Sequence, residues 1–293
     1  MAANLPMPTP SPPRKPFKSF KVISFDVYGT LIDFKPSIVA AFQPLISHLP
    51  DSSPYKSRMT TSNHELDPGG AKLLGLFKQH EDRLLVGKGK GLRRFDGVMH
   101  DIYLGIAKEV GVEEYAELEA EAEAFGKGVG ELPAFPDSVD ACLRLSRLGY
   151  KLVFLSNIEK WASHQTADGP LGEAQFWRRY TANDFEQDDP DRNKLKYLIS
   201  QVRKDSHDEG LGVVQQDEVL HVAQSLGHDH APAKELGLST VWIVRDSVKW
   251  GKEGEMREFI EKGKVGYGWR FMTLREFADA VEEEWAESKK AEV

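Results

Sequence analysis

The chain has 293 residues, a formal net charge of −8 at pH 7 and 40% hydrophobic residues, enough to bury one domain or one domain with an insertion. The negative charge argues against a nucleic-acid-binding surface, and no apolar run approaches the ~20 residues that span a bilayer. Its single cysteine, Cys142, cannot form an intramolecular disulfide, so we expect a cytoplasmic protein.

The first twenty residues are rich in proline and lack an apolar segment. They resemble neither a secretory signal nor a foldable element, so we expect a disordered tail over residues 1–20. The basic cluster RKPFK within this tail leaves a nuclear location open as an alternative.

The stretch KVISFDVYGTLID, residues 21–33, predicts a buried parallel strand that ends at a carboxylate. Lys21–Phe25 is a short apolar run with β-branched residues. Asp26 follows at the carboxyl end, which is where open α/β sheets bind ligands, and Gly29 and Thr30 then supply a flexible bend and a hydroxyl. Asp26 could instead only cap the turn, as aspartate often does.

The same stretch resembles the first motif of the haloacid dehalogenase superfamily, whose first aspartate is the nucleophile. Phosphatase members usually carry a second aspartate two positions later as the general acid. Here that position is Tyr28. The segment DVYGTL is therefore similar to the first motif of the type II 2-haloacid dehalogenase branch, and the chain resembles a fungal-type member. The resemblance implies an α/β fold, a Rossmann-like parallel sheet flanked by helices with an inserted helical cap.

Helical spacing of apolar residues predicts four helices after the first strand, over residues 36–49, 71–85, 95–109 and 113–125. No strand is expected among them. In the family, an inserted cap of this kind closes over the active site and excludes water. Ordinary crossover helices are the alternative, but nearly a hundred residues is long for one crossover. We therefore assign residues 37–133 to the cap, and 21–36 with 134–288 to the core.

A helix capped at Asp137 or Ser138 and ended by Gly149 is expected next. The strand Lys151–Leu155 follows and finishes in Ser156 and Asn157. This ending resembles the second motif of the family. A hydroxyl and an amide at a strand end can hydrogen-bond a carboxylate or a phosphate.

The third motif of the family usually contains a lysine that neutralises the nucleophile and the substrate. In this chain the aligned position is Asp189, which would add repulsion beside Asp26 and remove a cation that favours its ionised form. Asp189 is also suited to cap a helix that starts at Pro190. Arg192 or Lys194 could substitute as the cation, and the sequence leaves this open.

The strand Val219–Ser225 leads into LGHDHAPAKELG, which resembles the fourth motif, with Asp229 in the acidic position. Neighbouring side chains on an extended segment point to opposite faces, so His228, Asp229 and His230 are not expected to bind one metal ion together. A further strand over 239–244, a short helix around 256–260 and a helix capped by Thr273 and Glu276 complete the predicted elements.

The resemblance implies a hydrolase in which Asp26 attacks a small 2-haloacid or similar anion and forms an aspartyl ester. It assigns catalytic roles to Asp26, Thr30, Ser156 and Asp229, and substrate-binding roles to Tyr28, Asn157, Ser225 and His228. No cofactor, nucleic acid or membrane is expected, and a homodimer is possible. A cap cation that would bind substrate is unplaced, with Lys78 and Arg83 as candidates.

Two alternatives remain. Asp26 and Asp229 could hold Mg²⁺ in a phosphatase, although Tyr28 replaces the usual acid. The chain could also be a catalytically impaired binding protein, because Asp189 replaces the lysine of the third motif.

Overall fold

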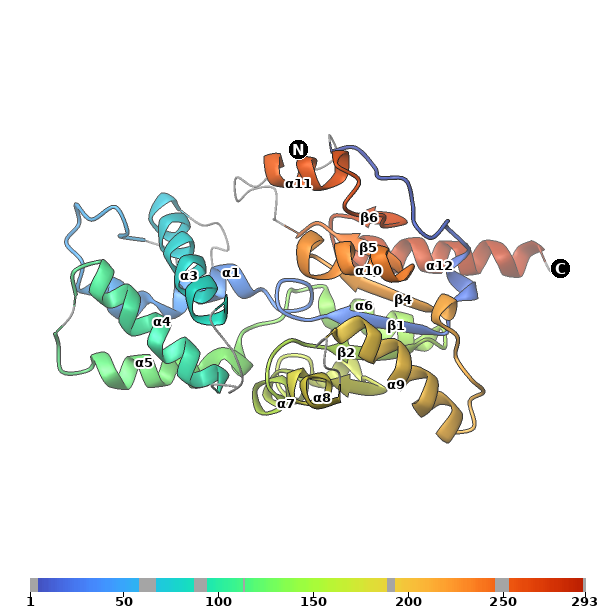
Figure 1. The fold of residues 1–293 in the computed structure, drawn as a ribbon, viewed down its shortest axis with the longest axis horizontal. Coiled ribbons are helices and arrows are strands. Elements are labelled where there is room, and N and C mark those ends of the chain that lie inside the picture. Colours follow the sequence, from blue (N-terminus) through green and yellow to red (C-terminus); the bar gives the residue numbers. More distant parts are fainter. Residues whose placement is uncertain are drawn as a thin grey trace. The chain divides into compact units, whose positions relative to one another are not determined.

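The structure is a computed structural model that describes residues 5–57, 67–86, 94–112, 114–188, 193–245 and 253–291 (Figure 1). The chain divides into two compact units. A core unit contains residues 1–32, 134–160 and 167–293, and a helical unit contains 33–133 and 161–166. Among the described residues, no helix is both long and apolar enough to cross a membrane.

The core unit is built on one six-stranded parallel sheet in the order β3-β2-β1-β4-β5-β6. This confirms the predicted α/β class. The chain order reverses between β1 and β4, and ligands of such sheets bind outside the carboxyl ends of the strands at this point. The strands are β1 (Val22–Asp26), β2 (Lys151–Leu155), β3 (Arg178–Tyr180), β4 (Val219–Ala223), β5 (Ser239–Ile243) and β6 (Trp269–Phe271).

The outer strands β3 and β6 are absent from the sequence prediction. Each has only three residues and carries arginine, as in Arg178-Arg179-Tyr180, so neither shows the apolar run that marks a buried strand. Their place at the sheet edges explains this composition, since charged residues are tolerated there.

Helices flank the sheet of the core unit (Figure 1). α9 (Lys194–Asp208) packs on one face through leucines and valines that join Val22, Val153 and Val219 in one buried cluster. Other helical elements of this unit are α6 (Ser138–Arg147), α7 (Lys160–Asp168, of which 161–166 belong to the helical unit), η4 (Gly172–Ala174), α8 (Ala182–Asp188), η5 (Gln216–Glu218), the π-turn η6 (Leu226–His230), α10 (Ala231–Leu236), α11 (Glu253–Glu261) and α12 (Leu274–Ala291).

The alternation of side chains along β1 decides which residues face α9. Val22 belongs to the α9 cluster, and residues two apart on a strand share a face, so Ser24 and Asp26 face the same side. On the neighbouring β4, Val219 belongs to that cluster too, and His221 and Ala223 follow it at the same spacing. Ser24 and His221 are direct partners in the register.

The predicted disordered tail is wrong for residues 5–20, which pack on the core unit. η2 (Phe17–Ser19) places the Phe17 ring 4.7 Å from that of Trp269 and 5.7 Å from that of Phe277. Leu5, Phe17 and Phe20 are buried, and Ser11 N donates to Gly266 O. The proline-rich composition suggested disorder, but Phe17 and Phe20 pack against Trp269 and Phe277, and Leu5 joins a separate buried cluster around Trp242 and Tyr267. These apolar contacts fix the segment.

The helical unit contains α1 (Phe34–Ala41), α2 (Gln43–Ser47), α3 (Pro68–Val86), α4 (Phe95–Glu109), α5 (Leu118–Lys127) and η3 (Gly128–Glu131). The bounds predicted for α4 are confirmed, whereas the helix predicted over 36–49 breaks at Phe42 and α5 begins later than expected. Phe42, Phe77, Tyr103 and Phe125 form its aromatic centre, with Phe42 stacked 5.0 Å from Tyr103. No strand lies among the described residues of this unit.

Candidate active site

The loop after β1 places a threonine hydroxyl on the Asp26 carboxylate. Gly29 has a φ of 92°, a left-handed conformation that glycine adopts without strain, and this turn brings Thr30 back toward the strand end. Thr30 Oγ1 lies 2.8 Å from Asp26 Oδ2 and accepts a hydrogen bond from Gln224 N at 2.9 Å. Because an ionised carboxylate can only accept, the Thr30 hydroxyl donates its hydrogen to Asp26.

Lys194, the first residue of α9, supplies the cation of the site. Its Nζ lies 2.6 Å from Asp229 Oδ1 and 3.5 Å from Asp26 Oδ1. The Asn193 side chain caps the helix by accepting hydrogen bonds from Leu195 N and Lys196 N, and so fixes where Lys194 begins. The substitute cation left open by the sequence is therefore Lys194.

The interpretation built on Asp189 needs correction. Asp189 and Arg192 lie outside the described residues, but the site does not lack a lysine, because Lys194 contacts both carboxylates. The N-cap of α9 is Asn193, in place of the predicted Asp189. An asparagine immediately before a helical pattern is an ordinary start signal. A helix predicted to start after Asn193 has Lys194 as its first residue.

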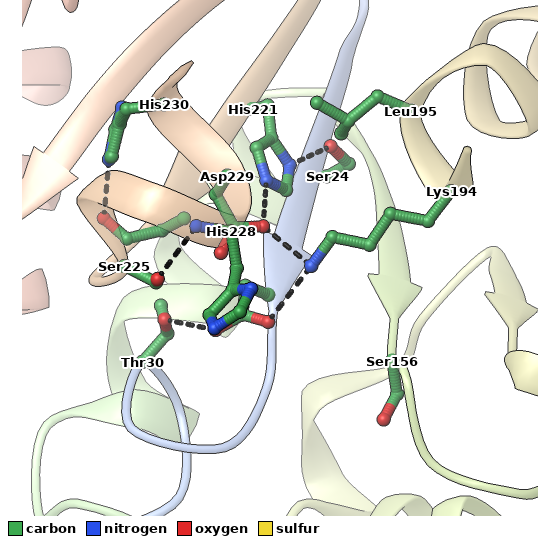
Figure 2. A network of polar contacts seen from close by, with 12 residues as sticks. Ser24, Thr30, Ser156, Lys194, Leu195, His221, Ser225, His228, Asp229 and His230 are labelled. Carbon is green, nitrogen blue, oxygen red and sulfur yellow. Dashed lines mark hydrogen bonds and ion pairs between the residues drawn. The ribbon is translucent and has the colours of Figure 1, made fainter. Parts of the chain in front are cut away.

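Asp229 is buried in a hydrogen-bond network that continues through β4 into β1 (Figure 2). His221 Nε2 lies 3.0 Å from Asp229 Oδ1, and His221 Nδ1 lies 2.8 Å from Ser24 Oγ. His221 and Ser24 are fully buried. Neither was singled out from the sequence, although a histidine inside the apolar strand VLHVA was the available signal.

The two carboxylates respond to this environment in opposite directions. Burial raises the pKa of Asp26, and the negative charge of Asp229 raises it further, while Lys194 opposes both. Burial also raises the pKa of Asp229, but Lys194 and His221 outweigh that effect and hold it well below its ordinary value. Burial lowers the pKa of Lys194, yet the two carboxylates produce a net increase, so it stays charged.

A second buried ion pair holds the Thr30 loop from another side. Arg245 Nε and Nη2 donate to Thr30 O at 3.0 and 2.7 Å, and Arg245 Nη1 donates to Asp137 Oδ1 at 2.7 Å. Arg245 has a φ of 52°, which is uncommon for a residue with a side chain. Asp137 also accepts from Arg275 N at 3.1 Å and makes no side-chain cap on its own helix, contrary to expectation.

The residues predicted from the second motif lie apart from this network. Ser156 is buried at the end of β2, and its Oγ accepts a hydrogen bond from Ile158 N at 3.1 Å; Figure 2 shows it away from Lys194 and Asp229. Asn157 is exposed, and Tyr28 is half-buried in the turn between Asp26 and Thr30. Their predicted roles stay predictions.

The fourth-motif residues lie on a helical turn and not on the extended segment expected from the sequence. The π-turn Leu226–His230 is capped by Ser225, whose Oγ accepts from His228 N at 3.1 Å. His228 is exposed. His230 is buried against Thr240 Oγ1 and Ala223 O, and burial lowers its pKa to about 4. The roles predicted for Ser225 and His228 stay predictions.

The cap candidates pair with acidic residues of their own unit. Lys78 Nζ lies 2.8 Å from Glu81 Oε2, and Arg83 Nη2 lies 3.8 Å from Glu109 Oε2. Neither contact assigns a substrate to these side chains.

Two carboxylates, Asp26 and Asp229, are the oxygen ligands that this site offers a magnesium ion. Mg²⁺ demands several oxygen ligands in octahedral geometry, but Asp26 and Asp229 are joined by the Lys194 ammonium. Nor do three or more His, Cys, Asp or Glu residues gather at a metal-binding distance anywhere in the described part of the chain.

Residues 20–235 match the family of haloacid dehalogenase-like hydrolases, while no curated protein gives a significant match. Among solved structures, an L-2-haloacid dehalogenase from Xanthobacter autotrophicus with chloropropionic acid covalently bound is similar at 19% identity and a TM-score of 0.58, over 90% of this chain and 98% of that one. Another L-2-haloacid dehalogenase is 20% identical, with a TM-score of 0.62, over 90% of this chain and 99% of that one. A Bacillus subtilis protein described as a hydrolase of this superfamily, bound to magnesium, is 15% identical, with a TM-score of 0.61, over 89% of this chain and 98% of that one.

At these identities the structural matches establish the fold alone. The family match covers most of the chain, including β1, Lys194 and Asp229. The chain therefore belongs to the family of haloacid dehalogenase-like hydrolases.

Proposed function

We propose that this protein is a hydrolase of the 2-haloacid dehalogenase type, with Asp26 as its nucleophile. The observation that carries the proposal is the paired contact on the Asp26 carboxylate, with Thr30 on Oδ2 and Lys194 beside Oδ1. A carboxylate at the carboxyl end of a central strand, oriented by a hydroxyl and balanced by a lysine, is equipped for nucleophilic attack. A structural relative with covalently bound chloropropionic acid supports a small 2-haloacid as substrate.

The reaction runs in two steps. An Asp26 oxygen forms a bond to C2 of the substrate, the carbon–halogen bond breaks, and the halide leaves with its electron pair. Water then attacks the carbonyl carbon of the aspartyl ester, releases the 2-hydroxyacid and a proton, and restores the Asp26 carboxylate. Thr30 holds the carboxylate in place, while the positive charge of Lys194 favours ionised Asp26 and offsets the charge of an anionic substrate.

The two alternatives have weaker support. A magnesium-dependent phosphatase would use Asp26 and Asp229 as ligands, but Lys194 joins them and Tyr28 replaces the usual acid. The magnesium-bound relative makes a metal arm in the assay worthwhile. The binding-protein alternative depended on a missing lysine and on the unplaced cap cation. The contacts of Lys194 answer the first point only.

Release of halide from 2-chloropropionate tests the proposal, with and without Mg²⁺. The wild-type protein is expected to release halide without metal, and Asp26→Asn is expected to abolish release. Asp140→Asn, which changes an exposed carboxylate on α6, serves as the matched control and should be active. Mass spectrometry after rapid acid quenching should show the substrate's mass on the peptide that contains Asp26.

Loss of activity in both variants, or a mass increase elsewhere, would contradict the assignment of the nucleophile. Turnover of an aryl phosphate that requires Mg²⁺, without halide release, would favour the phosphatase alternative.

A further inference from the structure

Ser24, His221 and Asp229 lie in the order of a Ser-His-Asp triad. The Ser24 Oγ to His221 Nδ1 distance is 2.8 Å, and the His221 Nε2 to Asp229 Oδ1 distance is 3.0 Å. A catalytic serine must reach substrate, but Ser24 is fully buried in the middle of β1. The triad therefore serves another purpose than nucleophilic attack by serine.

The hydrogen bonds assign one proton of the histidine. An ionised Asp229 can only accept, so His221 Nε2 carries the hydrogen and donates it. The Ser24 hydroxyl can donate to an unprotonated Nδ1 or accept from a protonated one. The bond from His221 to Asp229 is therefore kept in either protonation state of the ring, and Ser24 holds the ring from its other side.

Asp229 transmits this constraint to the lysine. Its Oδ1 accepts from His221 at 3.0 Å and from Lys194 at 2.6 Å, so one oxygen links strand β4 to the start of α9. Lys194 approaches Asp26 less closely, at 3.5 Å. A closer Lys194–Asp229 pair, free of the histidine, would draw the ammonium away from Asp26.

The backbone supports the same arrangement. Asp229 lies in the π-turn η6, where both Asp229 N and His230 N donate to Ser225 O, at 3.2 and 3.3 Å. Single π-turns occur frequently at functional sites. Here the turn leaves the Asp229 carboxylate facing β4 and α9, where His221 and Lys194 meet it (Figure 2).

We propose that His221 is a positioning residue that holds the Lys194 ammonium beside Asp26 by fixing Asp229. The proposal rests on the function proposed above, because its catalytic consequence requires Asp26 to be the nucleophile. Its geometric content, the position of Lys194, can be measured without any substrate.

Two variants of equal side-chain length separate the donor from the bulk of the ring. His221→Gln keeps an N–H donor at about the reach of Nε2, whereas His221→Met fills the buried strand position without a donor. We expect His221→Gln to keep turnover close to wild type. His221→Met should lose roughly tenfold to hundredfold in kcat, the scale seen when groups behind a site's primary ligands are removed, with KM changed less than kcat.

Tyr180→Phe is the matched control, because it removes a different, partly buried hydrogen bond between the sheet and α9, from Tyr180 OH to Asp205 Oδ2 at 2.8 Å. It should destabilise the fold without the loss in kcat. If His221→Met does not fold, His221→Leu replaces it as the donorless variant.

A double-mutant cycle with Lys194→Met tests whether the histidine acts through the lysine. In that background His221→Met should cost nothing further in kcat, whereas a purely structural role would give additive losses and overturn the proposal.

Crystal structures of the two histidine variants provide the readout that is independent of activity. The Lys194 Nζ to Asp26 Oδ1 distance should lengthen in His221→Met and stay as it is in His221→Gln. An unchanged distance in His221→Met would overturn the proposal even if the protein is an active dehalogenase. A wild-type protein without halide release would instead overturn the proposed function, and this distance would still decide the role of His221.

Discussion

Two buried ion pairs of the core unit contact the segment from Asp26 to Thr30. They differ in how closely the cation is held by its acceptors. The guanidinium of Arg245 donates hydrogen bonds to Asp137 and to the carbonyl of Thr30, at 2.7 to 3.0 Å. Lys194 is held at 2.6 Å by Asp229 but stands 3.5 Å from Asp26. Arg245 donates two hydrogen bonds to one backbone carbonyl, whereas the Lys194 ammonium faces the carboxylate of Asp26, the proposed nucleophile.

The difference follows from the chemistry of the two cations. A guanidinium is planar, stays charged and holds several acceptors in fixed directions, while an ammonium is a compact charge on a flexible stem. We infer that Arg245 stabilises the loop and Lys194 serves the reaction. Three substitutions test this division.

Arg245→Met should have the largest effect, and on stability. Removing one partner of a buried pair leaves an uncompensated charge, here Asp137, and costs about 3–5 kcal/mol. Urea unfolding measures the loss. Arg179→Met, which breaks an exposed pair with Asp168, should cost about 1 kcal/mol or less. A stable Arg245→Met protein that has lost its turnover would remove the distinction between the pairs.

Lys194→Met should act mainly on turnover, with a loss of about 10²–10³-fold in kcat, as for removal of one electrostatic stabiliser. Halide release under saturating substrate measures it. The exposed neighbour Lys196, changed to Met, is the control and should keep full activity. Unchanged turnover in Lys194→Met would show that the cation is not used.

The same variant predicts a direction for the pH profile. Asp26 must be ionised to attack, and burial and Asp229 raise its pKa, so kcat/KM should fall on the acid side at a higher pH than for an ordinary aspartate. Lys194 lowers that pKa, so its removal should move the acid limb further toward neutral pH. A shift in the opposite direction would contradict the assigned ion pair.

Asn193→Ala should have the smallest effect, on both properties at once. Loss of the cap of α9 costs about 1 kcal/mol, and fraying of the first turn loosens Lys194, so kcat should fall less than in Lys194→Met. Asn193→Asp, which can cap the helix, should recover the unfolding free energy. If alanine alters stability without altering kcat, the helix start does not control the position of the lysine.

Much of the candidate site could be placed from the sequence because its parts lie at strand ends. The apolar runs before Asp26 and before Ser156 predicted β1 and β2, and the strand expected over Val219–Ser225 predicted β4, which ends at Ala223. Parallel strands bring their carboxyl ends to one edge, so Asp26, Thr30 and the fourth motif were expected together. Of these, Asp26, Thr30 and Asp229 do belong to one network.

The partners of those residues were harder to find. The sequence did not single out Lys194 as the cation, because Asp189 occupied the position aligned with the third motif. The position of Lys194 depends on where α9 starts, which its cap Asn193 decides. His221 lies in the apolar strand VLHVA. A polar residue there interrupts the apolar run, but the sequence does not indicate which residue it hydrogen-bonds. The packed tail was missed because its anchors, such as Phe17, are isolated apolar residues among prolines.

The sequence by itself therefore determined the class of fold, most strands and helices, and the strand-end carboxylate, because periodicity and turn chemistry act over a few neighbouring residues. Only the tertiary structure decided which groups complete the site. Lys194 is 168 residues from Asp26 and His221 is 197 residues from Ser24. Such pairs are fixed by strand register and by where a helix starts against the sheet, and no local pattern carries that information.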